Sequence, residues 1–148
     1  MRSLLTITLC LLLMACSATQ RSNTTKEKPA LTGVIWKLAN IQSKDDSTGL
    51  PRAPGLYTLE FHKDGSGAIR ADCNTGRGNW AGEKTDQLNI TQLITTRAMC
   101  IPRSLHDQFI SDLNDTRSFT LNEGKLYLAT MTDGSILEFF SSPVTQVE

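Results

Sequence analysis

The sequence predicts a small domain that is mainly β with one helix (α+β), built as a closed or nearly closed antiparallel barrel. Three observations support this prediction. Short stretches of alternating apolar and polar residues recur along the chain, and turns that contain glycine separate them. A single apolar stripe at helical spacing follows residue 104. The length of 148 residues supports one domain comfortably and two only with difficulty.

The domain is expected to begin near residue 31 with a strand and a long loop. Val34, Trp36 and Leu38 alternate with other residue types, which predicts a half-buried strand with Trp36 in the core. A ligand-stacking role for Trp36 is the alternative. Residues 43–55 contain two prolines, two glycines and several charges, so we expect a loop there.

Four further strand patterns follow this loop. Residues 56–63 and 68–72 flank Asp64-Gly65, and both of these turn residues tolerate the positive φ of a tight hairpin. Residues 77–81, around a second tryptophan, and residues 87–90 make the next two short strands. Residues 93–99 fit neither a strand nor a helix clearly.

One helix and three last strands complete the pattern. Ser104 to Asp107 matches a capping box, in which the serine oxygen accepts a hydrogen bond from the amide three residues on. Leu105, Phe109 and Leu113 follow at spacing four and form an apolar stripe. This stripe predicts a helix that runs to about Asn114. The strands are predicted at residues 118–121, 125–129 and 136–140, with turns at 122–124 and 132–134.

The N-terminus is predicted to carry an export signal. An apolar run at residues 4–13 follows Arg2; it is too short to span a bilayer but has the size of a secretory signal. It ends in Leu13-Met14-Ala15-Cys16, which resembles the lipobox of bacterial lipoproteins. We therefore expect removal of residues 1–15 and lipidation of Cys16, with ordinary signal cleavage nearby as the alternative.

The lipobox also predicts where the protein resides. Residues 16–30 would be the lipidated cysteine and a flexible tether, because this stretch has no large apolar residue. By resemblance to sorting in Gram-negative bacteria, Ser17 favours the outer membrane, with the domain facing the periplasm. The folded domain is then expected at residues 31–141, with a C-terminal tail at 142–148.

Two of the four cysteines remain for the folded domain. Cys10 leaves with the signal and Cys16 carries lipid, so Cys73 and Cys100 form an even pair in an oxidising compartment. A disulfide is the simplest interpretation; two buried free thiols, or a redox or metal site, are the others. No metal is expected, because His62 and His106 stand at no ligand-like spacing from the cysteines.

Charge and residue types exclude several function classes. The chain has 15 basic and 15 acidic residues, so it shows no electrostatic footprint for nucleic acid. Neither histidine has neighbours that mark a nucleophile, and we predict no enzyme activity, no catalytic residue and no cofactor. Asn74 is expected to satisfy backbone groups at a tight turn or to take a left-handed conformation; a catalytic asparagine is the alternative.

Short stretches along the chain form one ordered set: Trp36-Lys37-Leu38, Phe61 with Asp64-Gly65, Cys73-Asn74 with Gly76 and Gly78, Thr96-Arg97-Ala98-Met99-Cys100, Phe109 with Leu113, Leu126-Tyr127-Leu128 and Leu137-Glu138-Phe139. In this order they resemble the META domain, also called the HslJ-like (DUF306) family of bacterial lipoproteins. The resemblance covers residues 31–141. One departure is Asp72, because the family often has glycine directly before its Cys-Asn pair.

The resemblance implies a small β-barrel with a helix and no catalysed reaction. Family members include lipoproteins and proteins linked to heat shock, antibiotic tolerance and virulence. The expected function is therefore stress tolerance or envelope maintenance through binding of an envelope protein or an apolar ligand. A pilot-like chaperone lipoprotein is the alternative, and an envelope protease inhibitor that uses residues 43–55 comes after it.

Overall fold

The computed structural model describes residues 30–82, 86–131 and 134–143. The predicted signal sequence, Cys16, most of the tether and the end of the tail lie outside these ranges. No helix within them is long and apolar enough to cross a membrane. The elements of the described ranges are β1 (Val34–Gln42), β2 (Thr48–Gly49), β3 (Tyr57–Phe61), β4 (Ser66–Ala71), β5 (Asn74–Ala81), β6 (Asn89–Thr95), α1 (His106–Asn114), β7 (Thr116–Asn122), β8 (Lys125–Thr130) and β9 (Ile136–Pro143).

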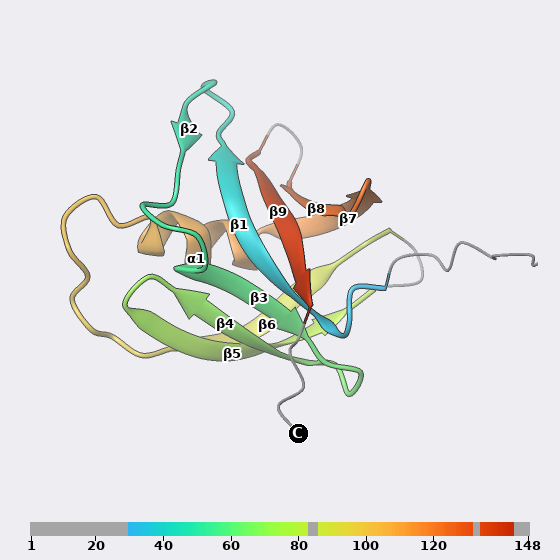
Figure 1. The fold of residues 1–148 in the computed structure, drawn as a ribbon. Coiled ribbons are helices and arrows are strands. Elements are labelled where there is room, and N and C mark those ends of the chain that lie inside the picture. Colours follow the sequence, from blue (N-terminus) through green and yellow to red (C-terminus); the bar gives the residue numbers. More distant parts are fainter. Residues whose placement is uncertain (1–29, 83–85, 132–133, 144–148) are drawn as a thin grey trace, which may run out of the picture.

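The strands form one curled antiparallel sheet that makes a half-barrel (Figure 1). Its order is β6-β5-β4-β3-β1-β9-β8-β7, and β2 pairs with β1 beside this path. The two ends of the sheet meet at one point, where Leu88 N donates to Arg117 O and Phe119 N donates to Asp86 O, both at 3.0 Å. The predicted mainly β fold with one helix and a barrel-like antiparallel sheet is confirmed, and the barrel is a half-barrel and not a closed one.

Glycines of β4 and β5 face each other in the curled sheet. Gly67 pairs with Gly78 across the two strands, and neither presents a side chain to the inside of the curl. A Cβ at Gly76 would clash with the carbonyl oxygen of Ile94 on β6. The β5–β6 register shifts between Arg77 and Asn79, which marks a β-bulge. Missing side chains and an irregular ladder together let these strands bend over the core.

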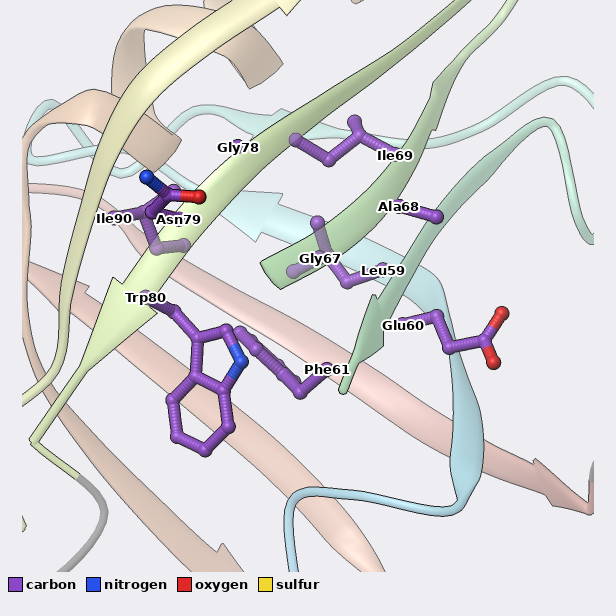
Figure 2. Close-up of a pocket in the computed structure, with 10 residues that line it drawn as sticks. All are labelled: Leu59, Glu60, Phe61, Gly67, Ala68, Ile69, Gly78, Asn79, Trp80 and Ile90. Carbon is purple, nitrogen blue, oxygen red and sulfur yellow. The ribbon is translucent and has the colours of Figure 1, made fainter. Parts of the chain in front are cut away.

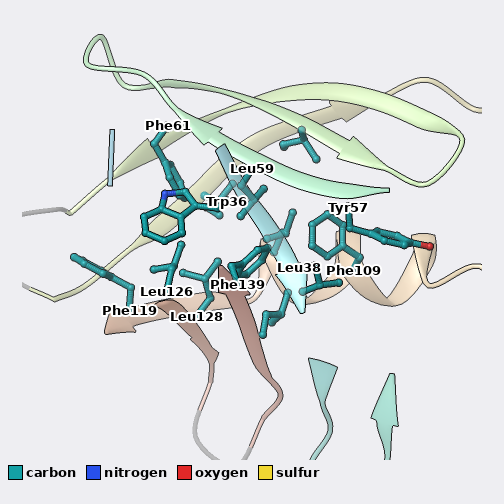
Figure 3. Packing of buried hydrophobic residues seen from close by; sticks show 14 of the residues in the cluster. Trp36, Leu38, Tyr57, Leu59, Phe61, Phe109, Phe119, Leu126, Leu128 and Phe139 are labelled. Carbon is teal, nitrogen blue, oxygen red and sulfur yellow. The ribbon is translucent and has the colours of Figure 1, made fainter. Parts of the chain in front are cut away.

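The core fills the inside of the curl and the space under α1 (Figure 3). Trp36 on β1 is 2% exposed, and its indole Nε1 donates to Leu31 O at 2.9 Å. The prediction that Trp36 belongs to the core is confirmed. Phe109 on α1 packs edge-on against Tyr57 with ring centroids 5.3 Å apart, so the helix closes one end of the half-barrel.

A small gap remains between β3, β4 and β5, next to Trp80 (Figure 2). Its volume is about 10 Å³, at the lower limit for holding one water molecule. Phe61 and Trp80 pack edge-on across it with centroids 5.2 Å apart. This gap therefore has no room for an apolar ligand.

The helix starts differently from the capping-box prediction. Its N-cap is Leu105, with no capping hydrogen bond from a side chain, and its first residue is His106. Ser104 Oγ accepts from the amide of His106, two residues on instead of three, at 3.2 Å. The same hydroxyl lies 3.1 Å from Tyr57 Oη. The capping box was therefore wrong, because Ser104 is drawn toward the sheet and the helix begins after it.

Several other boundaries differ from the predictions, and β9 continues to Pro143, two residues into the predicted tail. β6 spans Asn89–Thr95, so the ambiguous stretch after residue 92 begins as strand. β5 starts already at Asn74, because Asn74 pairs with Ala71 at the end of β4. The loop at residues 43–55 contains the short strand β2, held by pairing with β1. The predicted turn at residues 132–134 lies partly outside the described ranges.

Candidate functional site at the disulfide loop

A disulfide joins Cys73 to Cys100, as the cysteine count predicted, with the two Cα atoms 5.5 Å apart. Cys73 stands just before β5, and Cys100 lies in the segment between β6 and α1. We call residues 96–104 the disulfide loop. The bond closes a sequence separation of 27 residues, which in the chain-entropy model stabilises the fold by about 3–4 kcal/mol.

Asn74 holds the disulfide loop by acting as a substitute strand partner. Its side chain is buried, and the residue is only 1% exposed. Asn74 Oδ1 accepts from Ala98 N at 2.7 Å and from Thr96 Oγ1 at 2.8 Å, while Asn74 Nδ2 donates to Ala98 O at 3.0 Å. The prediction that Asn74 satisfies backbone groups is confirmed, and its polar atoms are committed to structure.

The left-handed residue at this turn is Asp72, one position before the disulfide. Its φ is 59°, a conformation that glycine adopts at low cost and that aspartate tolerates. This explains why glycine suits the position. Asp72 N donates to Leu56 O at 2.7 Å, so the turn is tied to the chain that enters β3.

Asp72 is also the centre of a polar cluster under the disulfide loop. Its side chain is 4% exposed, and Asp72 Oδ1 lies 2.8 Å from Arg52 Nη2. Burial raises the pKa of Asp72, but the Ser104 hydroxyl and the Arg52 guanidinium lower it by more, so the pKa stays below its ordinary value. Tyr57 Oη accepts from Leu105 N at 2.8 Å and continues the cluster toward α1. These contacts join the loop before β3 to the turn at Asp72 and to the end of the disulfide loop at Ser104.

The side chains that project from the disulfide loop are apolar or cationic, whereas those that anchor it are polar. Met99 is 99% exposed and Ile101 is 52% exposed. Arg97 and Arg103 flank them and are exposed as well. A hollow of about 560 Å³ lies between this stretch and the start of α1. The loop thus presents an apolar tip between two cations on a rigid frame.

A second hollow of about 410 Å³ adjoins the first on the β5–β6 side. Thr95 lines both. Arg77 and Ile94 pair across the two strands at its edge, and Ile94 is 61% exposed. We call the whole face the disulfide-loop surface and define it by Arg77, Ile94, Arg97, Met99, Ile101 and Arg103.

The site residues singled out from the sequence therefore separate into three groups. Trp36 is a core residue of β1. Asn74, Gly76 and Thr96 build the frame of the disulfide loop, while Arg97 and Met99 project from it. The sequence analysis did not single out Arg52, Tyr57 or Ser104, because their meeting depends on contacts between segments 20 to 48 residues apart. The aspartate in a glycine position was the available signal for this cluster.

The histidines do not form a catalytic arrangement in the described ranges. His62 Nδ1 lies 2.9 Å from Ser66 Oγ, but that hydroxyl donates to Asp64 Oδ1 at 2.7 Å, so its proton points away from the imidazole. Glu60 Oε1 is 3.6 Å from His62 Nε2, which is beyond hydrogen-bond distance. These contacts close the β3–β4 hairpin. No group of three or more His, Cys, Asp or Glu residues in the described ranges could hold a metal ion.

Comparison with known proteins gives a family and a fold. The family model described as META domain matches residues 29–143. A solution structure of a protein from Burkholderia xenovorans is similar at 22% identity with a TM-score of 0.61, over 76% of this chain and 83% of that chain. A crystal structure of a DUF4847 family protein from Bacteroides vulgatus is similar at 18% identity with a TM-score of 0.54, over 77% of this chain and 96% of that chain. No curated protein matches the chain.

Proposed function

Because the chain belongs to the META domain family, we propose that it is a non-enzymatic lipoprotein of the bacterial envelope that acts by binding. Cys16 anchors it to the outer membrane by acyl chains, and the domain faces the periplasm. Its role is stress or antibiotic tolerance, or maintenance of the envelope. The disulfide-loop surface is the binding surface.

One observation carries the choice of this surface: anchoring and presentation are divided between different side chains. The polar groups of Asn74 and Thr96 are used in hydrogen bonds within the frame. The side chain of Met99 does not take part in this frame, since Met99 is 99% exposed. A loop whose backbone is already held by a disulfide and several hydrogen bonds loses little backbone conformational entropy when it binds a partner through an exposed apolar side chain. This arrangement suits binding, because the exposed side chain is free to contact a partner. It does not suit catalysis, because the polar groups of Asn74 and Thr96 are already used in hydrogen bonds within the frame.

The anchoring part of the proposal is tested by cell fractionation. The wild-type protein is expected in the outer-membrane fraction, and the Cys16→Ala variant is expected outside it because it has no acyl chains. A Cys10→Ala variant is the matched control, since Cys10 lies in the predicted signal and should not matter. Unchanged fractionation of Cys16→Ala would remove the lipoprotein assignment.

The functional part is tested by complementation of a deletion strain under heat or antibiotic challenge. Wild type is expected to restore survival, and Met99→Ser is expected to restore it only partly, although this variant should fold normally. Met131→Ser is the control, because Met131 is also exposed, at 60%, and lies away from the disulfide-loop surface. Full rescue by Met99→Ser would show that the binding surface lies elsewhere.

A further inference from the structure

The disulfide-loop surface combines three features. It has an apolar tip, formed by Met99 and Ile101, which are 99% and 52% exposed. Cations flank the tip on both sides. The whole is held by the disulfide and by the Asn74 hydrogen bonds to Ala98. A ligand of this surface is therefore expected to offer an apolar region for Met99 and Ile101 and groups that interact favourably with the flanking cations.

The charge of the surface is uncompensated. Among the residues the structure describes, Arg77, Arg97 and Arg103 form no ion pair. The only acid that lines the two hollows is Asp107, whose carboxylate lies 2.9 Å from His106 Nδ1. Three arginines and one aspartate leave a surplus of two positive charges when the histidine is neutral. The ligand is therefore expected to be anionic.

The apolar tip is raised on the loop. Met99 has almost no protein contact, so its side chain can enter an apolar phase without rearrangement of the domain. In the interfacial region of a bilayer, an apolar side chain reaches the acyl boundary while flanking arginines stay at the level of the phosphates. Hydrophobic insertion and attraction to anionic lipid then act on the same few residues.

We propose that the disulfide-loop surface binds the surface of an anionic phospholipid bilayer. Met99 and Ile101 insert among the headgroups, and Arg77, Arg97 and Arg103 contact lipid phosphates. This inference rests on the proposed function, because it takes the disulfide-loop surface to be the binding surface and names its ligand. It adds a second membrane contact, independent of the acyl anchor, that would orient the domain on the bilayer.

The test is vesicle co-sedimentation of the oxidised chain that begins at residue 16 and carries Cys16→Ala. Neither lipid nor the apolar signal can then contribute, and all described residues are retained. Vesicles of phosphatidylglycerol mixed with phosphatidylcholine are compared with vesicles of phosphatidylcholine alone. Binding is expected only to the anionic vesicles and is expected to weaken as salt rises, because salt screens exposed charges.

Variants assign the binding to named residues. Arg97→Gln with Arg103→Gln is expected to weaken binding on the order of 25-fold, from roughly fivefold for each arginine near an anionic surface. Met99→Ser is expected to weaken it about tenfold through lost apolar burial. The matched controls are Lys44→Gln with Lys63→Gln, and Met131→Ser, all at exposed positions outside the surface. Equal melting temperatures show that the variants fold.

Two results would overturn the inference. One is the absence of binding to anionic vesicles at low salt, in which case an acidic protein segment becomes the partner to seek. The other is an equal loss of binding in the control variants. Because purified protein without an anchor is used, either result leaves the fractionation and complementation outcomes unaffected, so the proposed function can stand when this inference fails.

Discussion

The substitution Asn74→Ala tests the central claim about the disulfide loop, that one buried amide holds it to the sheet. The change removes the acceptor for Ala98 N and Thr96 Oγ1 and the donor to Ala98 O. A net hydrogen bond in a protein contributes about 0.5–1.5 kcal/mol, so three of them predict a loss of about 1.5–4.5 kcal/mol. Ala98 is itself exposed, and water can bind its freed backbone groups, which keeps the loss from rising further.

The substitution Asn74→Asp separates hydrogen bonding from side-chain size. In the wild type, Asn74 Nδ2 lies against Ala98 O and the sulfur atoms of Cys73 and Cys100. A carboxylate at this position can still accept from Ala98 N, but its second oxygen takes the place of the donor and faces these acceptors. Burial then raises the pKa of the new carboxyl above its unfolded value. The variant is therefore expected to be less stable than Asn74→Ala at neutral pH and to recover stability as the pH falls toward about 4.

Urea unfolding of the oxidised proteins, followed by tryptophan fluorescence, measures both effects. Asn79→Ala is the matched control, because Asn79 lies on the same strand and its hydrogen bond to Gln92 is exposed. Its effect is expected to stay within about 0.5 kcal/mol. An Asn74→Ala variant that unfolds at the same urea concentration as wild type would refute the claim that Asn74 holds the loop.

Three further predictions concern the core, the curl of the sheet and a half-buried acid. Trp36→Ala should lower the free energy of unfolding by about 3–5 kcal/mol, since it empties a buried site; a near-neutral result in the same assay would place the ring outside the core. Gly76→Ala should cost about 1–3 kcal/mol, because its Cβ would clash with Ile94 O, whereas Thr75→Ala next to it should be nearly neutral. Burial, together with Asp115, raises the pKa of Asp112 despite the Ser135 hydroxyl, and its Oδ2 has no partner among the described residues. Ionised Asp112 thus lowers stability once the pH exceeds the ordinary aspartate value, so Asp112→Asn should raise the melting temperature at neutral pH and lose this effect below about pH 4.

Local patterns identified most of the elements, but they missed β2 and did not give the exact ends of the others. The alternation around Trp36 and the turn at Asp64-Gly65 identified β1 and the β3–β4 hairpin, because side-chain period and turn chemistry act over a few residues. The capping-box prediction was wrong because the Ser104 hydroxyl lies within hydrogen-bond distance of Tyr57, which is 47 residues away along the chain. A rule that considers only neighbouring residues, such as the capping box, cannot predict a contact between distant parts of the chain.

The sequence by itself determined the mainly β class, the single helix, the cysteine pair and the family, because each depends on residue type, short-range spacing or the order of motifs. The tertiary structure alone decided which side chains share a site. It placed Arg52 against Asp72 and turned the amide of Asn74 toward Ala98, while Met99 was left in solvent. The physical reason is that hydrogen bonds and burial form between segments far apart in the chain, and the curl of the sheet determines which of those segments meet.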